Sequence, residues 1–383
     1  MNSEFPLPAN GFSNTHQRVA LVNSHWQLLL YKLRYLGVRN TLRVAFLDLS
    51  ESVLCRLAKR FPSFRFSPRS IQIECTTRCN LKCTICEISY WTEKGGDLDL
   101  KNLEMIIGHL PKLRRVDLTG IGEGLMNRNF FKALELLKSR GLYVTLNDNF
   151  TLLNEKAAQR IVELGVDQIF LSLDGATKST YEQIRVGANF DKVIFNARRL
   201  MQVKRDMKKK RPEMKINTVV CSDNYNELPA IVELAHDMGI GMVQFVNVIT
   251  FDSTARLTTT SVHQEIRARF QEVLARARQL GILVKIELFN KKPVQQCDFP
   301  WKRNFVTYDG YVHPCCYTTQ TGDRNAQNQR SLGNLVDHHF ADVWRTEAYS
   351  AFRTKLQSGI LPRICQDCPK YIGVPDAAAS PDK

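Results

Sequence analysis

The feature that most restricts the fold of this chain is a regular alternation between residues 71 and 280, where short apolar runs of β-strand type are followed by helical patterns. Strands are predicted at 71–75, 115–119, 142–147, 168–173, 215–220 and 242–247. Helices are predicted at 99–109, 128–139, 154–164, 190–206, 226–238 and 262–280. Repeated strand-then-helix units predict a parallel sheet that curls with its helices outside. We therefore expect an α/β fold, a partial (βα)6 TIM-type barrel, with functional residues at the carboxyl ends of its strands.

Three cysteines follow the first predicted strand in a CxxxCxxC spacing, Cys79, Cys83 and Cys86. Three thiolates on one short loop can bind three irons of a 4Fe-4S cube, and the fourth iron is then open to chelate a small molecule. Closely spaced cysteines also form structural zinc sites, for which Cys75 could supply a fourth thiolate. Cys75 lies in the register of the strand, before the loop begins. On the residues alone, both metals remain open.

This loop resembles the signature of the radical S-adenosylmethionine (SAM) superfamily, and the chain is similar to that family over about residues 71–372. The resemblance implies that SAM binds the open iron and is cleaved reductively to a 5'-deoxyadenosyl radical, which takes a hydrogen atom from the substrate. The LTGIGEG segment resembles the family's GGEP motif, in which Gly122 would allow close backbone approach and Glu123 would bind the SAM ammonium. Gly124 replaces the proline of that motif, which leaves the turn geometry open.

The same resemblance implies further SAM-binding positions at the strand ends. They are Ile85, Asn147, Ser172, Arg185 and Asn217. Ser172 and Arg185 would hold the ribose and the carboxylate of SAM, the guanidinium through a charge-assisted pair. The backbone near Gln244 and Val246 is a further candidate for the adenine side. Asp174 is expected at the same mouth, either as a catalytic base or substrate contact or as a solvated residue that caps a loop.

The C-terminal region contains a second group of cysteines. Its members are Cys297, Cys315, Cys316, Cys365 and Cys368. The spacing of Cys297, Gly310, Cys315, Cys365 and Cys368 resembles that of a SPASM or shortened twitch domain. This resemblance implies that the four cysteines bind an auxiliary 4Fe-4S cluster. A lone CxxC more often binds zinc. Cys316 is then spare, and it could replace Cys315 as a ligand or act as a catalytic hydrogen donor. Asp309 and Gly310 predict a hairpin turn within this region.

Four segments are predicted along the chain. They are a helical N-terminal extension (1–68), a radical SAM core (69–290), a small SPASM/twitch iron-sulfur domain (291–372) and a disordered tail (373–383). An apolar face over residues 15–61 predicts two or three helices, and Ser50 is expected to cap one that runs from Glu51 to Phe61 before Pro62. These helices suit a cap packed on the barrel, and their basic amphipathic character would also suit a membrane surface or an amphiphilic substrate. They do not resemble the winged helix that binds leader peptides, which disfavours a ribosomal-peptide substrate.

The composition favours a cytoplasmic protein with a large core. Of the 383 residues, 44% are hydrophobic, enough for a barrel-sized domain and a smaller one. Eleven cysteines without a signal peptide indicate a reducing compartment and metal binding rather than a disulfide framework. No apolar run approaches the roughly 20 residues that span a bilayer.

Basic residues are in excess over the whole chain, 53 against 38 acidic ones, for a net charge of +15. The basic run at residues 204–211 (KRDMKKKR) has no interleaved aromatic residues, which is typical of a solvated helix end. We therefore expect no nucleic-acid partner. The positive surface suits an acidic electron donor, flavodoxin or ferredoxin.

Three functional hypotheses follow. The first is a radical SAM oxidoreductase or maturase whose auxiliary cluster takes an electron from the substrate radical. The second is a redox-neutral epimerase in which Cys316 or Cys221 returns a hydrogen atom to the opposite face. The third is a zinc-bearing nucleic-acid-binding protein. The sequence leaves a small-molecule, a peptide and a lipid-like substrate open.

Overall fold

The computed structural model describes residues 20–21, 25–61, 67–91, 93–249, 262–287, 293–319, 323–365 and 368. The strands are β1 (Ala20–Leu21), β2 (Ser70–Ile73), β3 (Arg115–Leu118), β4 (Tyr143–Asp148), β5 (Gln168–Ser172), β6 (Glu213–Val220), β7 (Met242–Asn247), β8 (Leu283–Glu287), β9 (Asn304–Val306) and β10 (Val312–His313). The helices of the first part are α1 (His25–Arg60), α2 (Leu100–Gly108), α3 (Phe130–Ser139), α4 (Glu155–Leu164), α5 (Lys178–Ile184) and α6 (Phe190–Asp206). They are followed by α7 (Leu228–Asp237), α8 (His263–Leu280), α9 (Phe299–Lys302), α10 (Arg324–Gln329), α11 (Phe340–Arg345) and α12 (Glu347–Gln357).

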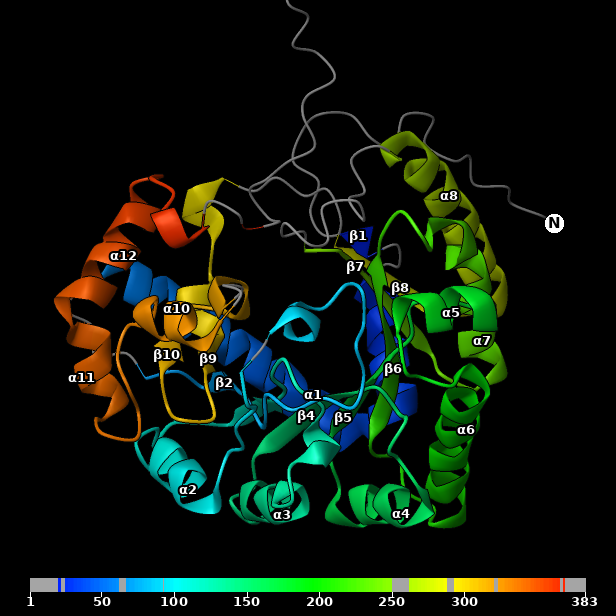
Figure 1. The fold of residues 1–383 in the computed structure, drawn as a ribbon, viewed down its shortest axis with the longest axis horizontal. Coiled ribbons are helices and arrows are strands. Elements are labelled where there is room, and N and C mark those ends of the chain that lie inside the picture. Colours follow the sequence, from blue (N-terminus) through cyan, green and yellow to red (C-terminus); the bar gives the residue numbers. More distant parts are fainter. Residues whose placement is uncertain are drawn as a thin grey trace, which may run out of the picture.

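The predicted strands and helices of the barrel are all confirmed, and α5 is an additional helix between β5 and α6. One mixed sheet runs in the order β1-β8-β7-β6-β5-β4-β3-β2-β9-β10. Strands β2 to β8 pair in parallel, β9 joins β2 in parallel, and β1 and β10 are antiparallel edge strands. The sheet stays open between β1 and β10, and the helices cover its outer side (Figure 1). The expected partial barrel is therefore confirmed.

Local signals explain where the helices begin and end. Asp99, Asn154 and Asn189 cap α2, α4 and α6, each accepting a hydrogen bond from the backbone N–H three residues on. Gly165 ends α4 and Gly281 ends α8, both with a φ of 67° that suits glycine. These stops lead each helix directly into the next strand.

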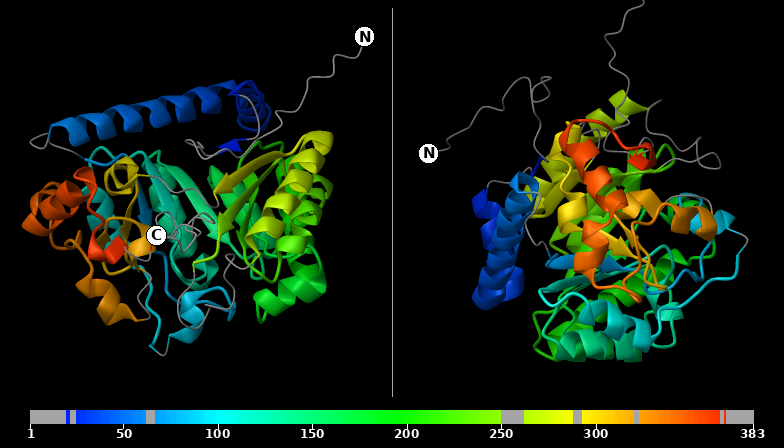
Figure 2. Two further views of the ribbon diagram at one scale, coloured as in Figure 1. Left: turned by 90° about the horizontal axis from the view of Figure 1, so that it is seen from above. Right: turned by 90° about the vertical axis from the view of Figure 1, so that its left-hand side faces the viewer.

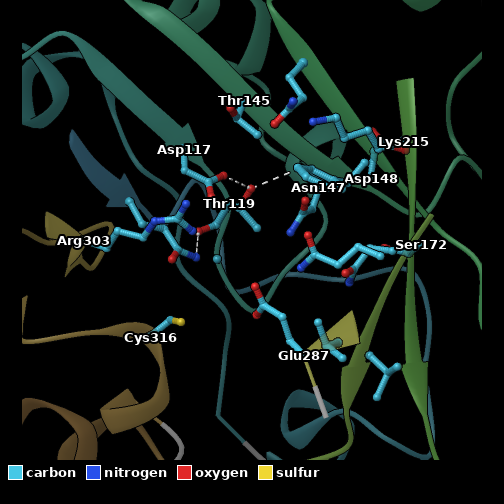
Figure 3. A pocket seen from close by; sticks show the side chains of 18 of the residues that line it. Asp117, Thr119, Thr145, Asn147, Asp148, Ser172, Lys215, Glu287, Arg303 and Cys316 are labelled. Atoms are coloured by element: carbon cyan, nitrogen blue, oxygen red, sulfur yellow. Dashed lines mark hydrogen bonds between the residues drawn. The ribbon is translucent and has the colours of Figure 1, made fainter. Parts of the chain in front are cut away.

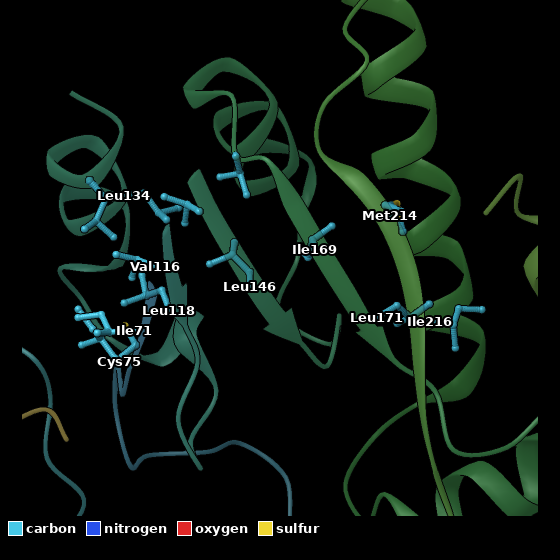
Figure 4. Close-up of a cluster of buried hydrophobic side chains, with 14 of the residues drawn as sticks. Ile71, Cys75, Val116, Leu118, Leu134, Leu146, Ile169, Leu171, Met214 and Ile216 are labelled. Carbon is cyan, nitrogen blue, oxygen red and sulfur yellow. The ribbon is translucent and has the colours of Figure 1, made fainter. Parts of the chain in front are cut away.

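Alternate strand residues face the outer helices and form the core. Val116, Leu146, Ile169 and Ile216 are fully buried there, and Leu134 of α3 packs over the same layer (Figure 4). The residues between them point to the other side of the sheet, into the barrel. The barrel interior is thus lined by a set of side chains that the core does not use.

Helix α1 closes the amino-terminal edge of the sheet. Tyr31 packs on Met242 and Leu283, which begin β7 and β8. Asp48 forms an ion pair of 2.9 Å with Arg115 at the start of β3. Figure 2 shows α1 lying across this edge with one side turned away from the molecule. A kink at Gly37, with φ 74° and ψ 168°, divides the helix in two.

The expected cap at Ser50 is wrong. Helix α1 runs through Ser50 without a break, and the Ser50 hydroxyl donates to the carbonyl oxygen of Leu47 (2.9 Å). Packing of α1 against the strand ends stabilises the continuous helix, which outweighs the local preference of serine for a helix start. The predicted stop at Pro62 and the tail at 373–383 lie outside the described residues.

The C-terminal region extends the same sheet. The predicted hairpin is confirmed, since β9 and β10 pair antiparallel and Gly310 in the turn has a φ of 91°. Arg324 forms an ion pair of 2.7 Å with the fully buried Glu74, next to β2, and its guanidinium lies 4.4 Å from the Tyr308 ring centroid. This region is therefore joined to the barrel by both backbone pairing and a buried charge pair.

Candidate functional site

A cavity of about 750 Å³ fills the barrel interior. The loop that carries Cys79, Cys83 and Cys86 borders it at the carboxyl ends of the strands, and Tyr31 and Asp48 of α1 border it at the other end. Figure 3 shows polar side chains from several strands pointing into the same space. The site therefore lies where a parallel barrel places its functional groups.

The cysteine loop is held by backbone hydrogen bonds to the C-terminal end of α5 and the residues directly after it. The N–H groups of Lys82 and Thr84 donate to the carbonyl oxygens of Val186 (2.9 Å) and Ile184 (2.8 Å). Within the loop, Asn80 donates to the Thr151 hydroxyl beyond β4 (2.7 Å). The loop is thus fixed on two sides, and its thiols have a defined position relative to the cavity.

The three thiols fit a cationic cluster. Burial and the neighbouring cysteines raise the pKa of Cys86 to about 12, and burial raises that of Cys79 to about 11. Burial also raises the pKa of Cys83. Because the thiolates of Cys79 and Cys83 raise the pKa of Cys86, three thiolates are costly without a metal, and metal binding would release their protons. Cys75 is not part of this group, because it is buried in the core beside Asn127.

Gly122 lies directly against this loop. Its N–H donates to the carbonyl oxygen of Thr76 (3.1 Å), and the N–H of Glu123 donates to that of Arg78 (2.8 Å). A Cβ at Gly122 would lie 2.4 Å from the first oxygen and 2.5 Å from the second, so only glycine fits. The Glu123 turn and the cysteine loop therefore form one rigid unit.

Glu123 borders the cavity as a buried carboxylate. Its Oε2 accepts a hydrogen bond from the N–H of Asn149 (2.9 Å), while its buried Oε1 has no hydrogen-bond donor among the described residues. Burial and the neighbouring Asp148 carboxyl raise the pKa of Glu123 well above its usual range, and burial raises that of Asp148 to about 6. A bound ammonium group would satisfy Oε1 and offset this cost. Asp148 was not among the predicted site residues.

Arg185 lines the cavity and is held from behind by Asp174. The two side chains form an ion pair of 2.7 Å, and Asp174 also accepts a hydrogen bond from the N–H of Val219 (2.7 Å). The expectation that Asp174 faces the mouth is wrong, because this carboxylate is fully buried in the barrel wall. The physical reason is the charge of Arg185, which compensates the burial of the Asp174 carboxylate.

The other predicted SAM positions all border the cavity. They are Ile85, Asn147, Ser172 and Asn217, together with Gln244 and Val246. Ser172 and Asn217 are paired neighbours on β5 and β6, and Asn217 and Gln244 are neighbours on β6 and β7. The structure thus brings these side chains to one wall of the cavity, opposite the second cysteine group.

Several cavity residues were not predicted. They include Gln72, Asp117, Thr145, Lys215, Lys285 and Arg303. Asp117 accepts a hydrogen bond from the Thr119 hydroxyl (2.7 Å; Figure 3). Lys215 pairs with Glu213 at 3.2 Å. Polar residues at every second position of otherwise buried strands are the signal that could have identified them, because the two faces of a strand alternate.

The second cysteine group lies on the opposite side of the cavity. Burial and the surrounding cysteines raise the pKa of Cys315 well above its usual range; these neighbours are Cys316, Cys297, Cys365 and Cys368. Cys315 is buried, whereas Cys316 lines the cavity (Figure 3). None of the eleven cysteines, all of which are described, forms a disulfide.

Comparison with known families identifies the two parts. The model of the radical SAM superfamily matches residues 73–235, and that of the SPASM iron-sulfur cluster-binding domain matches residues 297–369. The chain belongs to the radical SAM superfamily. It is an enzyme of the SPASM type, and these domains imply SAM, a SAM-binding 4Fe-4S cluster and auxiliary iron-sulfur binding. The predicted segment boundaries enclose both matches but remain predictions.

Two relatives cover most of this radical SAM enzyme. The tungsten-containing aldehyde ferredoxin oxidoreductase cofactor-modifying protein of Pyrococcus furiosus is 26% identical over 322 residues, 78% of this chain and 86% of the relative. A probable GTP 3',8-cyclase of Methanococcus maripaludis is 26% identical over 263 residues, 64% of this chain and 84% of the relative.

Solved structures share the fold. Streptococcus suis SuiB bound to S-adenosylmethionine has a TM-score of 0.62 at 15% identity, covering 86% of this chain and 78% of SuiB. Native anSMEcpe with bound AdoMet has a TM-score of 0.57 at 21% identity, covering 74% of this chain and 82% of anSMEcpe. At these identities the likeness shows the fold alone. In the described part of the radical SAM enzyme, no helix is long and apolar enough to cross a membrane.

Proposed function

We propose that this radical SAM enzyme takes a hydrogen atom from a polar substrate and oxidises the resulting radical through an auxiliary 4Fe-4S cluster. The observation that carries the proposal is that both cysteine groups border one cavity, the first through Cys79, Cys83 and Cys86 and the second through Cys316. An electron released in this cavity would have only a short path to the second group.

The residues of the first wall fit SAM. The three thiols would hold the first cluster, Glu123 would accept the SAM ammonium through its unsatisfied Oε1, and Arg185 would pair with the SAM carboxylate. Ser172 would bind the ribose hydroxyls. With both groups bound, the cluster and SAM supply the 5'-deoxyadenosyl radical. The chain's own part is to orient the substrate beside this wall and to exclude water, which α1 does at the closed end of the barrel.

The second cysteine group favours oxidation. Cys297, Cys315, Cys365 and Cys368 would bind an auxiliary cluster with no open iron, so the substrate could not coordinate it. Such a cluster can accept one electron, and loss of a proton to a cavity carboxylate such as Asp117 would complete the oxidation of the substrate radical. Burial raises the pKa of Asp117, which suits a group that takes up a proton.

A polar substrate fits the cavity better than a hydrocarbon chain. Lys215, Lys285 and Arg303 bring positive charge into a space that also holds Asp117 and Glu287. Such groups favour hydroxyl, phosphate or carboxylate groups on the substrate, whether it is a small molecule or a polar side chain of a peptide. The relatives are named for different activities, so their names favour no single substrate.

Anaerobic purification and reconstitution test the proposal. We expect a brown protein with about eight irons per chain that releases 5'-deoxyadenosine from SAM in the presence of a low-potential reductant. Deuterium should move from a labelled polar substrate into 5'-deoxyadenosine. Cys365→Ala should retain SAM cleavage and lose net oxidation. A colourless, zinc-loaded protein that does not cleave SAM would contradict the enzyme function and favour a zinc-bearing binding protein.

Epimerisation is a second candidate, favoured by the position of Cys316 at the cavity. There the Cys316 thiol would return a hydrogen atom to the opposite face of the substrate radical. Cys221 does not line the cavity; it is fully buried, and burial raises its pKa to about 12. Cys316→Ala separates the two reactions, since it should leave oxidation intact and stop net epimerisation.

An acidic electron donor fits the basic surface. Flavodoxin or ferredoxin would be attracted by the net charge of +15, in the reducing cytoplasm that the cysteine content favours. Raising the salt concentration should slow reduction of the enzyme by such a donor. A rate that is indifferent to salt would exclude this electrostatic attraction.

A further inference from the structure

Helix α1 exposes an apolar stripe on the side that faces away from the barrel. The stripe consists of Val38, Leu42, Phe46, Leu49, Val53 and Leu57, and Leu29 and Leu30 are also exposed on the part of α1 before the kink at Gly37. Steps of three and four residues from Leu42 to Val53 place these side chains on one face of the helix. Phe46 and Leu42 are each 65% exposed. The opposite face of α1, with Val44, Leu47 and Cys55, is buried, so α1 is apolar on both sides.

This exposure is concentrated rather than scattered. Of the thirteen large hydrophobic side chains exposed in the described residues, these eight and Phe61, directly after α1, belong to one segment. Contiguous apolar surface of this kind marks an interaction site. Between Val38 and Leu57 the stripe is about 30 Å long at 1.5 Å per residue.

Basic side chains surround the stripe on the same edge of the molecule. They are Arg39, Arg56 and Arg60 on α1 and Lys112, Arg114, Arg140, Lys208, Lys209 and Lys210 in the loops before β3, β4 and β6, all exposed. Contacts place these loops beside α1: Arg43 donates to the carbonyl oxygen of Gly141 (2.5 Å), and Lys210 Nζ lies 3.5 Å from the position of a Cβ on Gly37. Fewer acids are exposed at this edge: Asp48 on α1, which pairs with Arg115 and Lys32, and Asp206 and Asp237.

We propose that the α1 edge of this enzyme docks on an anionic phospholipid bilayer, with α1 lying in the plane of the interface. Apolar side chains would enter the acyl boundary, and the surrounding lysines and arginines would contact phosphate and carboxylate headgroups.

A second copy of the chain fits this edge less well. Pairing two α1 helices antiparallel would bring Arg39 and Arg43 of one copy against Arg56 and Arg60 of the other, and parallel pairing would oppose identical arginines. Like charges at such an interface are destabilising. A bilayer with anionic headgroups complements both the stripe and the charges.

Docking through α1 sets the orientation of the site. Helix α1 covers the amino ends of the strands, whereas the loop with Cys79, Cys83 and Cys86 lies at their carboxyl ends. The cavity mouth would therefore face away from the bilayer, where an electron donor can reach it.

Vesicle co-sedimentation of the full chain tests the proposal. Binding is expected to vesicles of phosphatidylcholine mixed with phosphatidylserine, to weaken with salt, and to be much weaker on phosphatidylcholine alone. Phe46→Ser with Leu49→Ser should lower the affinity by at least about tenfold. Phe195→Ser is the matched apolar control, since Phe195 is 58% exposed on α6 and should leave binding unchanged.

A charge reversal tests the electrostatic part. Changing Lys208, Lys209 and Lys210 to glutamate should weaken binding by at least about 100-fold, at roughly a factor of five for each lysine removed. The matched control changes Lys132, Lys156 and Lys192, which are exposed near the starts of α3, α4 and α6 at the opposite edge, and should leave binding unchanged.

Three results would overturn the proposal. One is no binding to the anionic vesicles. Another is equal loss of binding in the control variants, which would indicate attraction by net charge alone. The third is a dimer of the chain that Phe46→Ser with Leu49→Ser converts to a monomer, which would assign the stripe to a second copy. Circular dichroism of each variant checks that it is folded.

Discussion

Replacing Gly122 by alanine tests whether the cysteine loop and the Glu123 turn act as one unit. The new Cβ would lie 2.4 Å from the carbonyl oxygen of Thr76 and 2.5 Å from that of Arg78, whereas ordinary contact begins at 3.4 Å. Both oxygens belong to backbone and accept hydrogen bonds from Gly122 and Glu123, so neither can rotate away. The turn and the loop must therefore separate by about 1 Å, the difference between 3.4 and 2.4 Å.

Such overpacking costs about 1–3 kcal/mol of folding free energy. A displacement of about 1 Å at a reacting centre can also lower the rate about 100-fold. We expect Gly122→Ala to fold, to bind SAM at least about tenfold more weakly and to form 5'-deoxyadenosine about 100-fold more slowly. Urea unfolding, equilibrium dialysis of SAM and chromatography of 5'-deoxyadenosine measure the three effects on anaerobically reconstituted protein.

Gly108→Ala is the matched control. A Cβ at Gly108, the last residue of α2, meets nothing within 4 Å, and alanine favours a helix over glycine by up to about 1 kcal/mol. This variant should be as active as the parent and at least as stable. If Gly122→Ala matched it in SAM affinity and rate, the loop and the turn would not be coupled in the way the contacts indicate.

Three further predictions concern the charges and the second cysteine group. Burial raises the pKa of Asp148 to about 6, so the contribution of its protonated carboxyl to the free energy of unfolding is full below the unfolded-state pKa and is lost as the pH rises through about 6. Asp148→Asn should therefore flatten the fall of this free energy with pH, measured by urea unfolding of the metal-free chain. A variant with the same pH dependence as the parent would contradict the prediction. Arg324→Met leaves the Glu74 carboxylate buried without its partner and should lower the free energy of unfolding by about 3–5 kcal/mol. Adding Glu74→Gln should recover part of this loss in thermal unfolding, and a further loss in the double variant would refute the pairing. Cys315→Ala should lower the iron content from about eight to about four atoms per chain, whereas Cys316→Ala should leave it unchanged. The reverse result would make Cys316 the ligand.

The order of the barrel follows from local patterns in the sequence. Each strand and helix has its own periodicity, and residues such as Asn154 and Gly165 mark the ends of α4 within the segment itself. The CxxxCxxC spacing after the first strand fixes where its loop lies, because parallel strands carry their carboxyl ends to one edge. The turn at Gly310 is likewise local.

The sequence by itself thus determined the fold class, the six strand-and-helix units and the two cysteine groups. Tertiary structure decided what each side chain faces: Asp174 is withdrawn into the wall by Arg185, Cys316 reaches the cavity while Cys315 does not, and α1 runs unbroken through Ser50 to close the barrel. The direction in which a side chain points, its partners and its burial depend on residues far apart in the chain. The periodicity of apolar residues and the spacing of cysteines depend only on residues close together in the sequence. For that reason the elements could be predicted, whereas the burial of Asp174 and the exposure of one face of α1 could not.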